Sequence, residues 1–174
     1  MKHLTTEEIE AGLDYVIESS KDNGVLELII RRPKEDEREV LETGELDAVK
    51  GLIGDVWLTD DGNVEAQIAI MNSRIIALLA QDRERWKLAG DQLYINLDLS
   101  EENLPAGTRL ETGSAILEVT PKPHNGCKKF VERFGLDAMK FVNSPVGKQL
   151  HLRGIYARVV KSGAIRQGDA VRKV

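Results

Sequence analysis

Cys127 is the single cysteine of the chain and the residue whose type and surroundings are best suited to chemistry. It follows a polar loop, residues 121–126, and is followed by Lys128 and Lys129. We expect a short helix to begin at Cys127, and a helix N-terminus and nearby lysines both favour a thiolate over a thiol. A thiolate can attack an electrophile, carry sulfur as a persulfide, or bind a soft metal. The alternative is a buried, inert cysteine, which the polar, glycine- and lysine-flanked context disfavours.

His124 precedes Cys127 by three residues, a spacing that can chelate a metal ion if the loop forms a turn. His151 could contribute from elsewhere in the chain, although a structural zinc site needs four ligands and the sequence supplies no convincing set. A Cys–His nucleophilic pair, with His124 as the base, is a second interpretation. In the third, both histidines are exposed to solvent or bonded to the backbone.

Basic residues cluster near the cysteine, and such residues can hold an anionic ligand, with arginine able to grip a phosphate in two places. They are Lys122, Lys128, Lys129 and Arg133, with Arg153 further along the chain. Each lysine taken alone is equally consistent with a solvated helix face. Asn96 and Asp98 are further candidates, because they lie on a predicted strand, or at its end, where loops can converge.

The composition sets the class of protein. The chain has 174 residues, 41% of them hydrophobic, and a net charge of -5, which predicts one globular domain over residues 1–174 and no nucleic-acid partner. No apolar run approaches the length of a membrane helix, and the first residues lack a signal-peptide core, so we expect no membrane association. One cysteine excludes an intrachain disulfide and favours a reducing, cytoplasmic setting.

Short strands separated by turns, with a few helices, make up the predicted secondary structure. Thr5 and Glu8 have the spacing of a capping box and begin a helix over residues 5–20. Asn72 or Ser73 caps a second helix. The predicted strands cover residues 25–32, 64–70, 93–99, 109–111, 115–120 and 155–160; turns are predicted at 60–63, 163 and 168–169, and short helices at 128–134, 137–142 and 145–150. This pattern favours a small barrel or sandwich decorated by helices over a doubly wound α/β fold.

An ordered set of segments resembles one known family. Arg31-Arg32-Pro33 and residues 51–57 come first, followed by Gly90-Asp91-Gln92 leading into a strand. Residues 104–108 and 113–120 precede the cysteine, and residues 153–160 with Gly163 and Gly168-Asp169 follow it. Together they resemble the MOSC domain, the module named after the C-terminal part of molybdenum cofactor sulfurases. The resemblance covers most of residues 4–173.

The resemblance implies a mainly β fold, a β-barrel of the MOSC type with flanking short α-helices, on which we expect the N-terminal helix to pack. It implies that Cys127 occupies the position of the family's cysteine, which ligates molybdenum in members that bind molybdopterin and handles sulfur in the sulfurases. Cys127 is therefore our predicted catalytic residue and metal ligand. We expect Lys122 and Arg153 to grip the cofactor's phosphate, and we add His124, Asn96 and Asp98 to the predicted cofactor-binding set.

Three functions remain open at this stage. The chain could be a molybdenum-dependent reductase of N-oxygenated compounds that needs an outside reductase. It could be a sulfur carrier or sulfurtransferase supplied by a cysteine desulfurase. It could also be a non-enzymatic barrel that binds a small anion or a protein. Gly54-Asp55 is followed by no histidine, unlike a base-detoxifying branch of the family, and no lysine is identified as a site for pyridoxal phosphate.

Overall fold

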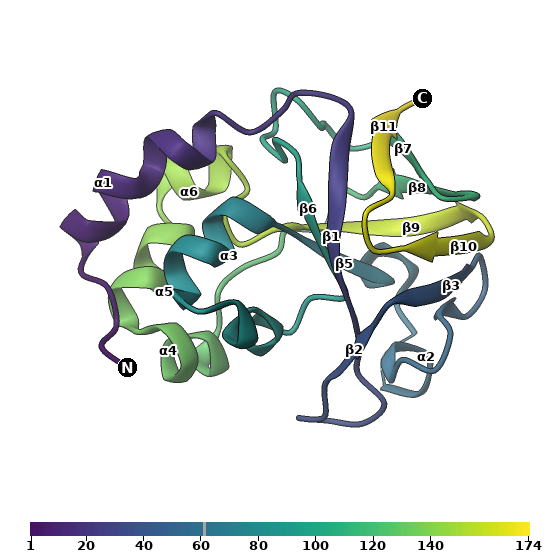
Figure 1. Ribbon diagram of the computed structural model, residues 1–174, viewed down its shortest axis with the longest axis horizontal. Coiled ribbons are helices and arrows are strands. Elements are labelled where there is room, and N and C mark those ends of the chain that lie inside the picture. The colour runs from purple at the N-terminus through teal and green to yellow at the C-terminus, as the bar shows by residue number, and fades with distance from the viewer. Residues whose placement is uncertain (61) are drawn as a thin grey trace.

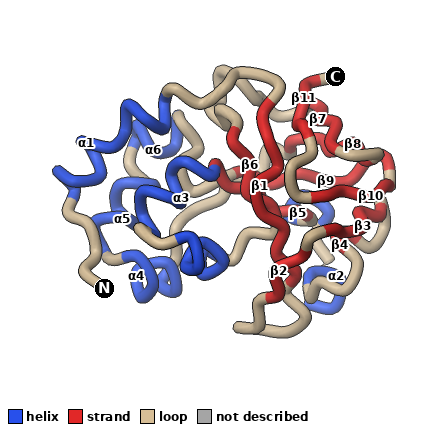
Figure 2. Tube along the Cα trace, viewed as in Figure 1, coloured by secondary structure: helices blue, strands red, loops and turns tan. Residues whose placement is uncertain are grey.

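Strands gather on one side of the molecule and most helices on the other, as Figure 1 shows and Figure 2 makes plain by colour. This computed structural model describes residues 1–60 and 62–174. The strands are β1 (Gly24–Arg31), β2 (Glu39–Leu41), β3 (Thr43–Asp47), β4 (Gly51–Leu52), β5 (Ile68–Asn72), β6 (Leu93–Asn96), β7 (Arg109–Thr112), β8 (Ala115–Val119), β9 (Ile155–Lys161), β10 (Gly163–Arg166) and β11 (Ala170–Lys173). The helices are α1 (Thr6–Ile17), α2 (Trp57–Asp60), α3 (Ser73–Ala80), α4 (Lys128–Phe134), α5 (Leu136–Val142) and α6 (Pro145–Gln149), with 3-10 turns η1 (Val64–Ala66) and η2 (Arg83–Ala89).

Seven strands close into a barrel. Their order is β11-β7-β8-β9-β5-β6-β1, and β1 pairs with β11 to complete the ring. Neighbouring strands of the ring are antiparallel except β5 and β6, which run parallel. Strand β2 extends the sheet beside β1, and β10, β3 and β4 form a second small sheet. The closed barrel with short helices confirms the predicted fold class.

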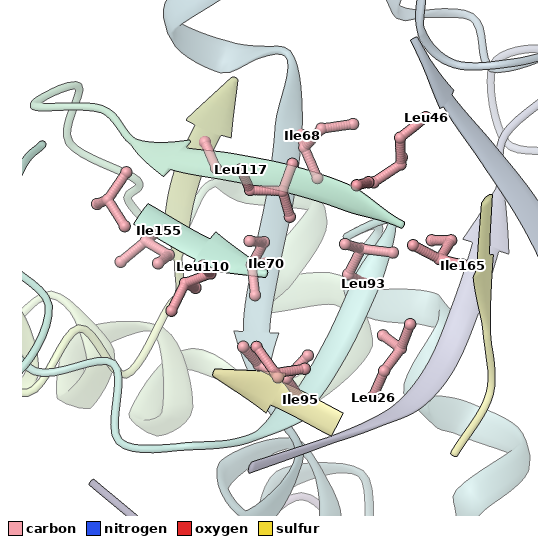
Figure 3. Packing of buried hydrophobic residues seen from close by; sticks show 14 of the residues in the cluster. Leu26, Leu46, Ile68, Ile70, Leu93, Ile95, Leu110, Leu117, Ile155 and Ile165 are labelled. Atoms are coloured by element: carbon pink, nitrogen blue, oxygen red, sulfur yellow. The ribbon is translucent and has the colours of Figure 1, made fainter. Parts of the chain in front are cut away.

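The interior of the barrel is filled by aliphatic side chains. Figure 3 shows Leu26, Ile70 and Leu117, from different walls of the barrel, among the residues that point into this core. The alternation in β8, whose residues are buried at every second position, places Ala115, Leu117 and Val119 inside. The described side chains of this core cluster are all apolar, so the cluster itself offers no group for polar chemistry.

A second, more aromatic core joins the helices to the outer face of the barrel. Leu28, Met71 and Tyr94 project outward from β1, β5 and β6 into this layer. Helix α1 packs against α3 and α5 within the layer. Its start is fixed by the predicted capping box: the Thr5 hydroxyl accepts the Glu8 N–H, and the Glu8 carboxylate accepts the Thr5 N–H.

Several predicted elements were wrong in detail. Residues 64–66 form η1 instead of the start of a strand, and β5 begins only at Ile68. The hairpin turn predicted at residues 60–63 is not formed by the described residues: Asp60 ends α2 and Asn63 caps η1, while Asp61 lies outside the described residues. Strand β6 ends at Asn96, and Gly163, predicted to be a turn, begins strand β10. The predicted turn at Gly168 is present, but the strand β11 that follows it was not predicted.

Within the part of the chain that the structure describes, no helix combines the length and the apolar character needed to cross a bilayer.

Candidate functional site

Cys127 opens onto a pocket of about 300 Å³ whose walls carry five basic side chains. The pocket lies outside the barrel, between the start of β6, helix α4 and the connection from β1 to β2. Its basic residues are Arg32, Arg38, Lys129, Arg133 and Arg153, and its other lining residues include His124, Trp57 and Tyr156.

Cys127 occupies the N-cap position of α4, so the helix begins where the sequence predicted. Its carbonyl oxygen accepts the N–H groups of Phe130 and Val131 at 3.0 and 3.1 Å, while its side chain makes no capping hydrogen bond. The cysteine is exposed. This exposure rules out the buried, inert alternative and leaves the sulfur accessible to a ligand.

A buried ion pair forms one wall of the pocket. Nη1 of Arg153 donates to Oδ2 of Asp91 at 2.7 Å, and Nη2 donates to the Ala89 carbonyl at 3.0 Å. The guanidinium also lies over the Phe130 ring, 5.1 Å from its centroid. Burial raises the pKa of Asp91 above its ordinary value, and the Arg153 charge opposes that effect. Nε of Arg153 and Oδ1 of Asp91 are both buried without a hydrogen-bond partner among the described residues.

His124 stands beside this pair as a neutral imidazole. Its Nδ1 lies 3.6 Å from Oδ1 of Asp91, which is too long for a hydrogen bond. Burial and the charges of Arg153 and Arg32 hold the pKa of His124 well below its ordinary value, so the contact is not an ion pair at neutral pH. The ring stacks on Tyr156 with centroids 4.3 Å apart. His124 and Cys127 therefore line one pocket, as two of the sequence hypotheses require.

Arg32 is fixed by a second buried carboxylate. Its Nε and Nη2 donate to the two oxygens of Asp55 at 3.0 and 2.7 Å, and its Nη1 donates to the Gly90 carbonyl at 3.2 Å. The Asp55 carboxylate also accepts Nε2 of Gln92 at 3.3 Å, which ties this pair to the barrel wall. Arg32 is thus a rigid part of the pocket.

Two further guanidinium groups approach the same backbone position. A methyl group built at Gly90 would lie 3.5 Å from Nη2 of Arg38 and 3.9 Å from Nη1 of Arg133. Burial, and the neighbouring charges of Arg133 and Arg32, lower the pKa of Arg38. Among the described residues Arg38 forms no ion pair, and its buried Nε has no hydrogen-bond partner. Asp60 is a further carboxylate on the pocket lining, so the pocket has no excess of positive charge, but Arg38 is the one of its five basic residues without an ion pair among the described residues.

Lys122 and His151 belong to a neighbouring, larger cavity of about 460 Å³. His124 and Arg153 line both cavities and separate them. Nδ1 of His151 lies 2.7 Å from the Leu99 carbonyl, so this histidine bonds to the backbone. Within the described ranges no three His, Cys, Asp or Glu side chains form a group able to hold a metal ion, so the hypothesis of a His124–Cys127–His151 metal site was wrong.

Asn96 ends β6 and Asp98 lies two residues beyond it, at the opposite end of the strand from Asp91. Oδ1 of Asn96 accepts Nε of Arg74 at 3.1 Å. Oδ1 of Asp98 accepts the Ser100 N–H at 2.8 Å, and its other oxygen pairs with Lys21. The structure does not bring these two residues to the Cys127 pocket.

Sequence reasoning missed Arg32, Arg38 and Asp91 as functional residues. A signal existed for two of them: Arg32 lies in the Arg-Arg-Pro segment, and Asp91 in the Gly-Asp step before β6, both noted only as part of a resemblance. Arg38 carried no such signal, because its neighbours in the sequence describe only a charged turn.

The architecture is that of a closed β-barrel with an external cysteine- and arginine-lined pocket. The family model described as "MOSC domain" matches residues 58–172, about two thirds of the chain, and the chain belongs to the MOSC domain family. No curated protein shows significant similarity to it.

Solved structures share the fold at low sequence identity. The YuaD protein from Bacillus subtilis has a TM-score of 0.60 at 15% identity, covering 86% of this chain and 94% of its own. YiiM from Escherichia coli has a TM-score of 0.58 at 17% identity, covering 86% and 69%. YiiM from Geobacillus stearothermophilus has a TM-score of 0.56 at 16% identity, covering 90% and 74%. At these identities the likeness is evidence of the fold alone.

Proposed function

We propose that the Cys127 pocket binds an anionic molybdenum cofactor of the molybdopterin type, with the Cys127 sulfur as a ligand to the metal. One observation carries this proposal: an exposed cysteine shares a pocket with five basic side chains, of which Arg38 forms no ion pair within the described residues. Family membership points the same way, because the MOSC domain is linked to molybdenum cofactor proteins in general.

The residues present fit such a group. A thiolate is a soft ligand of the kind that soft metal centres select. Guanidinium groups match the geometry of a phosphate, and Nε of Arg38 is a buried donor that has no acceptor among the described residues. Arg32 and Arg153 are each paired with a buried carboxylate, Asp55 and Asp91. These two pairs would keep the pocket walls rigid, and their own charges are already compensated.

Each residue then has a distinct task. Cys127 would hold the metal, while Arg38, Lys129 and Arg133 would bind the phosphate. His124, neutral and stacked on Tyr156, would present an uncharged imidazole to the pocket. When bound, the cofactor supplies two-electron reduction of an N–O or S–O bond. The electrons must come from an outside reductase, and a single cysteine fits a reducing, cytoplasmic setting.

A second candidate is a sulfur carrier, and the exposure of Cys127 at the start of α4 favours it. In this function the Cys127 thiolate attacks the outer sulfur of a persulfide on a cysteine desulfurase. The new S–S bond forms as the donor's S–S bond breaks, and the donor cysteine leaves as a thiolate. Nothing is oxidised or reduced overall, and no second cysteine is required.

Native mass spectrometry with molybdenum analysis separates the two candidates. The wild type and Cys127→Ala would be expressed in a host supplied with molybdenum and sulfur. We expect the wild type to carry a molybdopterin-sized adduct and stoichiometric molybdenum, both lost in Cys127→Ala. An adduct of sulfur atoms alone would favour the carrier. A bare wild-type chain would contradict both and leave a barrel that binds a small anion or a protein.

Two charge variants locate the phosphate. Arg133→Gln removes a guanidinium from the Cys127 pocket, whereas Lys122→Gln removes an ammonium from the larger cavity only. We expect Arg133→Gln to lose the adduct and Lys122→Gln to keep it. The reverse result would place the phosphate in the larger cavity, where the sequence had predicted it through Lys122.

A further inference from the structure

Two carboxylates of the chain already sit on the cations of the Cys127 pocket. The connection from β1 to β2 carries an exposed acidic loop, residues 34–37 (Figure 1). Nζ of Lys129 lies 2.9 Å from Oε1 of Glu35 and 3.1 Å from Oδ1 of Asp36. Nη2 of Arg133 lies 3.3 Å from the same Asp36 oxygen. The loop therefore reaches across to helix α4 and pairs with two basic residues that line the pocket.

These basic residues form an anion rim, which we define as Arg38, Lys129 and Arg133. Lys129 and Arg133 can direct the same N–H groups either to the loop carboxylates or to an oxyanion in the pocket. Arg38 follows the loop directly and has no carboxylate partner among the described residues. Of the three, only Arg38 is left uncompensated, so the loop neutralises the part of the rim that faces it.

The loop can leave at little cost. Its four residues are exposed, so its displacement uncovers almost no apolar surface. Asp36 has φ +62, a left-handed conformation that a non-glycine residue adopts at some expense. Besides the backbone hydrogen bond from Glu37 N–H to the Lys34 carbonyl, Asp36 is held by its ion pairs to Lys129 and Arg133, and exposed ion pairs of this kind are individually weak.

We propose that Glu35 and Asp36 are an internal occupant of the anion rim, which a ligand carrying a phosphate or diphosphate group displaces on binding. The inference rests on the proposed function, because it presupposes that the rim binds an anion. An anion can bind only to the molecules in which the loop has left the anion rim. The apparent affinity for the anion is therefore the intrinsic affinity multiplied by the fraction of molecules in which the rim is free. The loop carboxylates thereby compete with weakly binding anions, and only a ligand with higher affinity for the anion rim displaces them.

Two single-charge variants of the loop test this proposal. Asp36→Asn removes the carboxylate that contacts Lys129 and Arg133, and asparagine tolerates φ +62 as well as aspartate does. Glu37→Gln is the matched control, since it removes the same charge from the same loop and Glu37 pairs only loosely with Lys34, at 4.0 Å. Isothermal titration with inorganic pyrophosphate at low ionic strength would give the affinities. We expect Asp36→Asn to bind about three- to tenfold more tightly than the wild type, and Glu37→Gln to stay within about twofold.

Hydrogen exchange of residues 34–37 gives an independent readout. Saturating pyrophosphate should increase deuterium uptake in the loop, opposite to the protection that a ligand usually confers. The wild type, Asp36→Asn and Glu37→Gln could all bind pyrophosphate equally well, with no rise in deuterium uptake. That result would contradict the proposal that Glu35 and Asp36 occupy the anion rim, and it would leave the anion site itself supported. If neither the wild type nor any variant binds pyrophosphate, the rim is no anion site, and this inference falls together with the phosphate part of the proposed function.

Discussion

Asp91 and Asp98 flank the same short strand, β6, and meet opposite environments at its two ends. Asp91 is fully buried, has one oxygen without a hydrogen-bond partner in the described part of the chain, and has a pKa raised by burial. Both carboxylate oxygens of Asp98 are paired, one with Ser100 and the other with Lys21. Burial raises the pKa of Asp98, but the hydrogen bonds from Lys21 and Ser100 outweigh that effect and leave the pKa lowered. The difference teaches that a polar residue beside a strand indicates a functional site only where some of its polar atoms lack hydrogen-bond partners within the protein.

Removal of the arginine at the Asp91 end should have the largest effect. Arg153→Met leaves a buried carboxylate without its partner, and we expect a loss of about 3–5 kcal/mol in the free energy of unfolding. Urea denaturation measures it. Lys21→Met is the control at the other end, where the lysine is largely exposed, and it should cost less than about 1 kcal/mol. Equal losses would erase the contrast between the two ends.

A methyl group at Gly90 would sharpen the comparison, because it would fill space in van der Waals contact with Arg38 and Arg133, where an anion would otherwise approach them. Gly90 has φ +90, so Gly90→Ala should cost about 1–2 kcal/mol in backbone strain. Gly168→Ala imposes similar strain at φ +95, but no atom of residues 1–60 or 62–174 lies within 4 Å of its new methyl group. We expect both variants to lose stability in thermal melts and only Gly90→Ala to lose pyrophosphate affinity. A parallel loss in Gly168→Ala would mean that strain alone explains the result.

The two aspartates should give opposite pH dependences. The unfolded chain has an aspartate pKa of about 3.9. With a raised pKa, Asp91 contributes most favourably below that value, and its contribution declines as the pH rises toward its folded pKa. With a lowered pKa, Asp98 contributes above that value, and its contribution is lost as the pH falls through its folded pKa.

Unfolding free energies of the wild type, Asp91→Asn and Asp98→Asn from about pH 2.5 to 7 would show these slopes, across the unfolded aspartate pKa. The difference between wild type and variant should change with pH in opposite directions for the two residues. Slopes of the same sign would show that the two ends of β6 are electrostatically alike.

The smallest effect on stability should come from Cys127→Ser. The side chain is exposed and caps nothing, so we expect a change within about 0.5 kcal/mol. The same variant should lose the molybdenum or sulfur adduct completely, as native mass spectrometry would show. A large loss of stability would instead give Cys127 a structural role and would weaken its assignment as a ligand.

Local signals in the sequence predicted local features well. Thr5 and Glu8 specify the start of α1, Asn72 caps α3, and Cys127 begins α4, because each depends on hydrogen bonds within one turn. The barrel followed from the many short strands and from the family resemblance. Strands β10 and β11 escaped prediction because each has four residues with a single fully buried side chain, too few to show alternation.

The pocket depended on contacts that no spacing encodes. Asp91 and Arg153 are far apart in the chain and meet only when β6 and the segment before β9 are in place. Asn96, the last residue of β6, and Asp98, two residues further on, lie at the opposite end of the strand from Asp91, where Arg74, Ser100 and Lys21 pair with them. Burial and pairing, which decide between these positions, are properties of the folded chain.

The seam that closes the barrel joins Gly24 and Val25 of β1 to Val171 and Ala170 of β11, from opposite ends of the sequence. During synthesis, β1 can therefore meet its last partner only after almost the whole chain has emerged. Until then the edge of β1 that β11 will cover offers unpaired backbone groups to other chains. Closure of this seam is a long-range, slow kind of contact, so we expect the nascent chain to complete its barrel as one of the final events of folding.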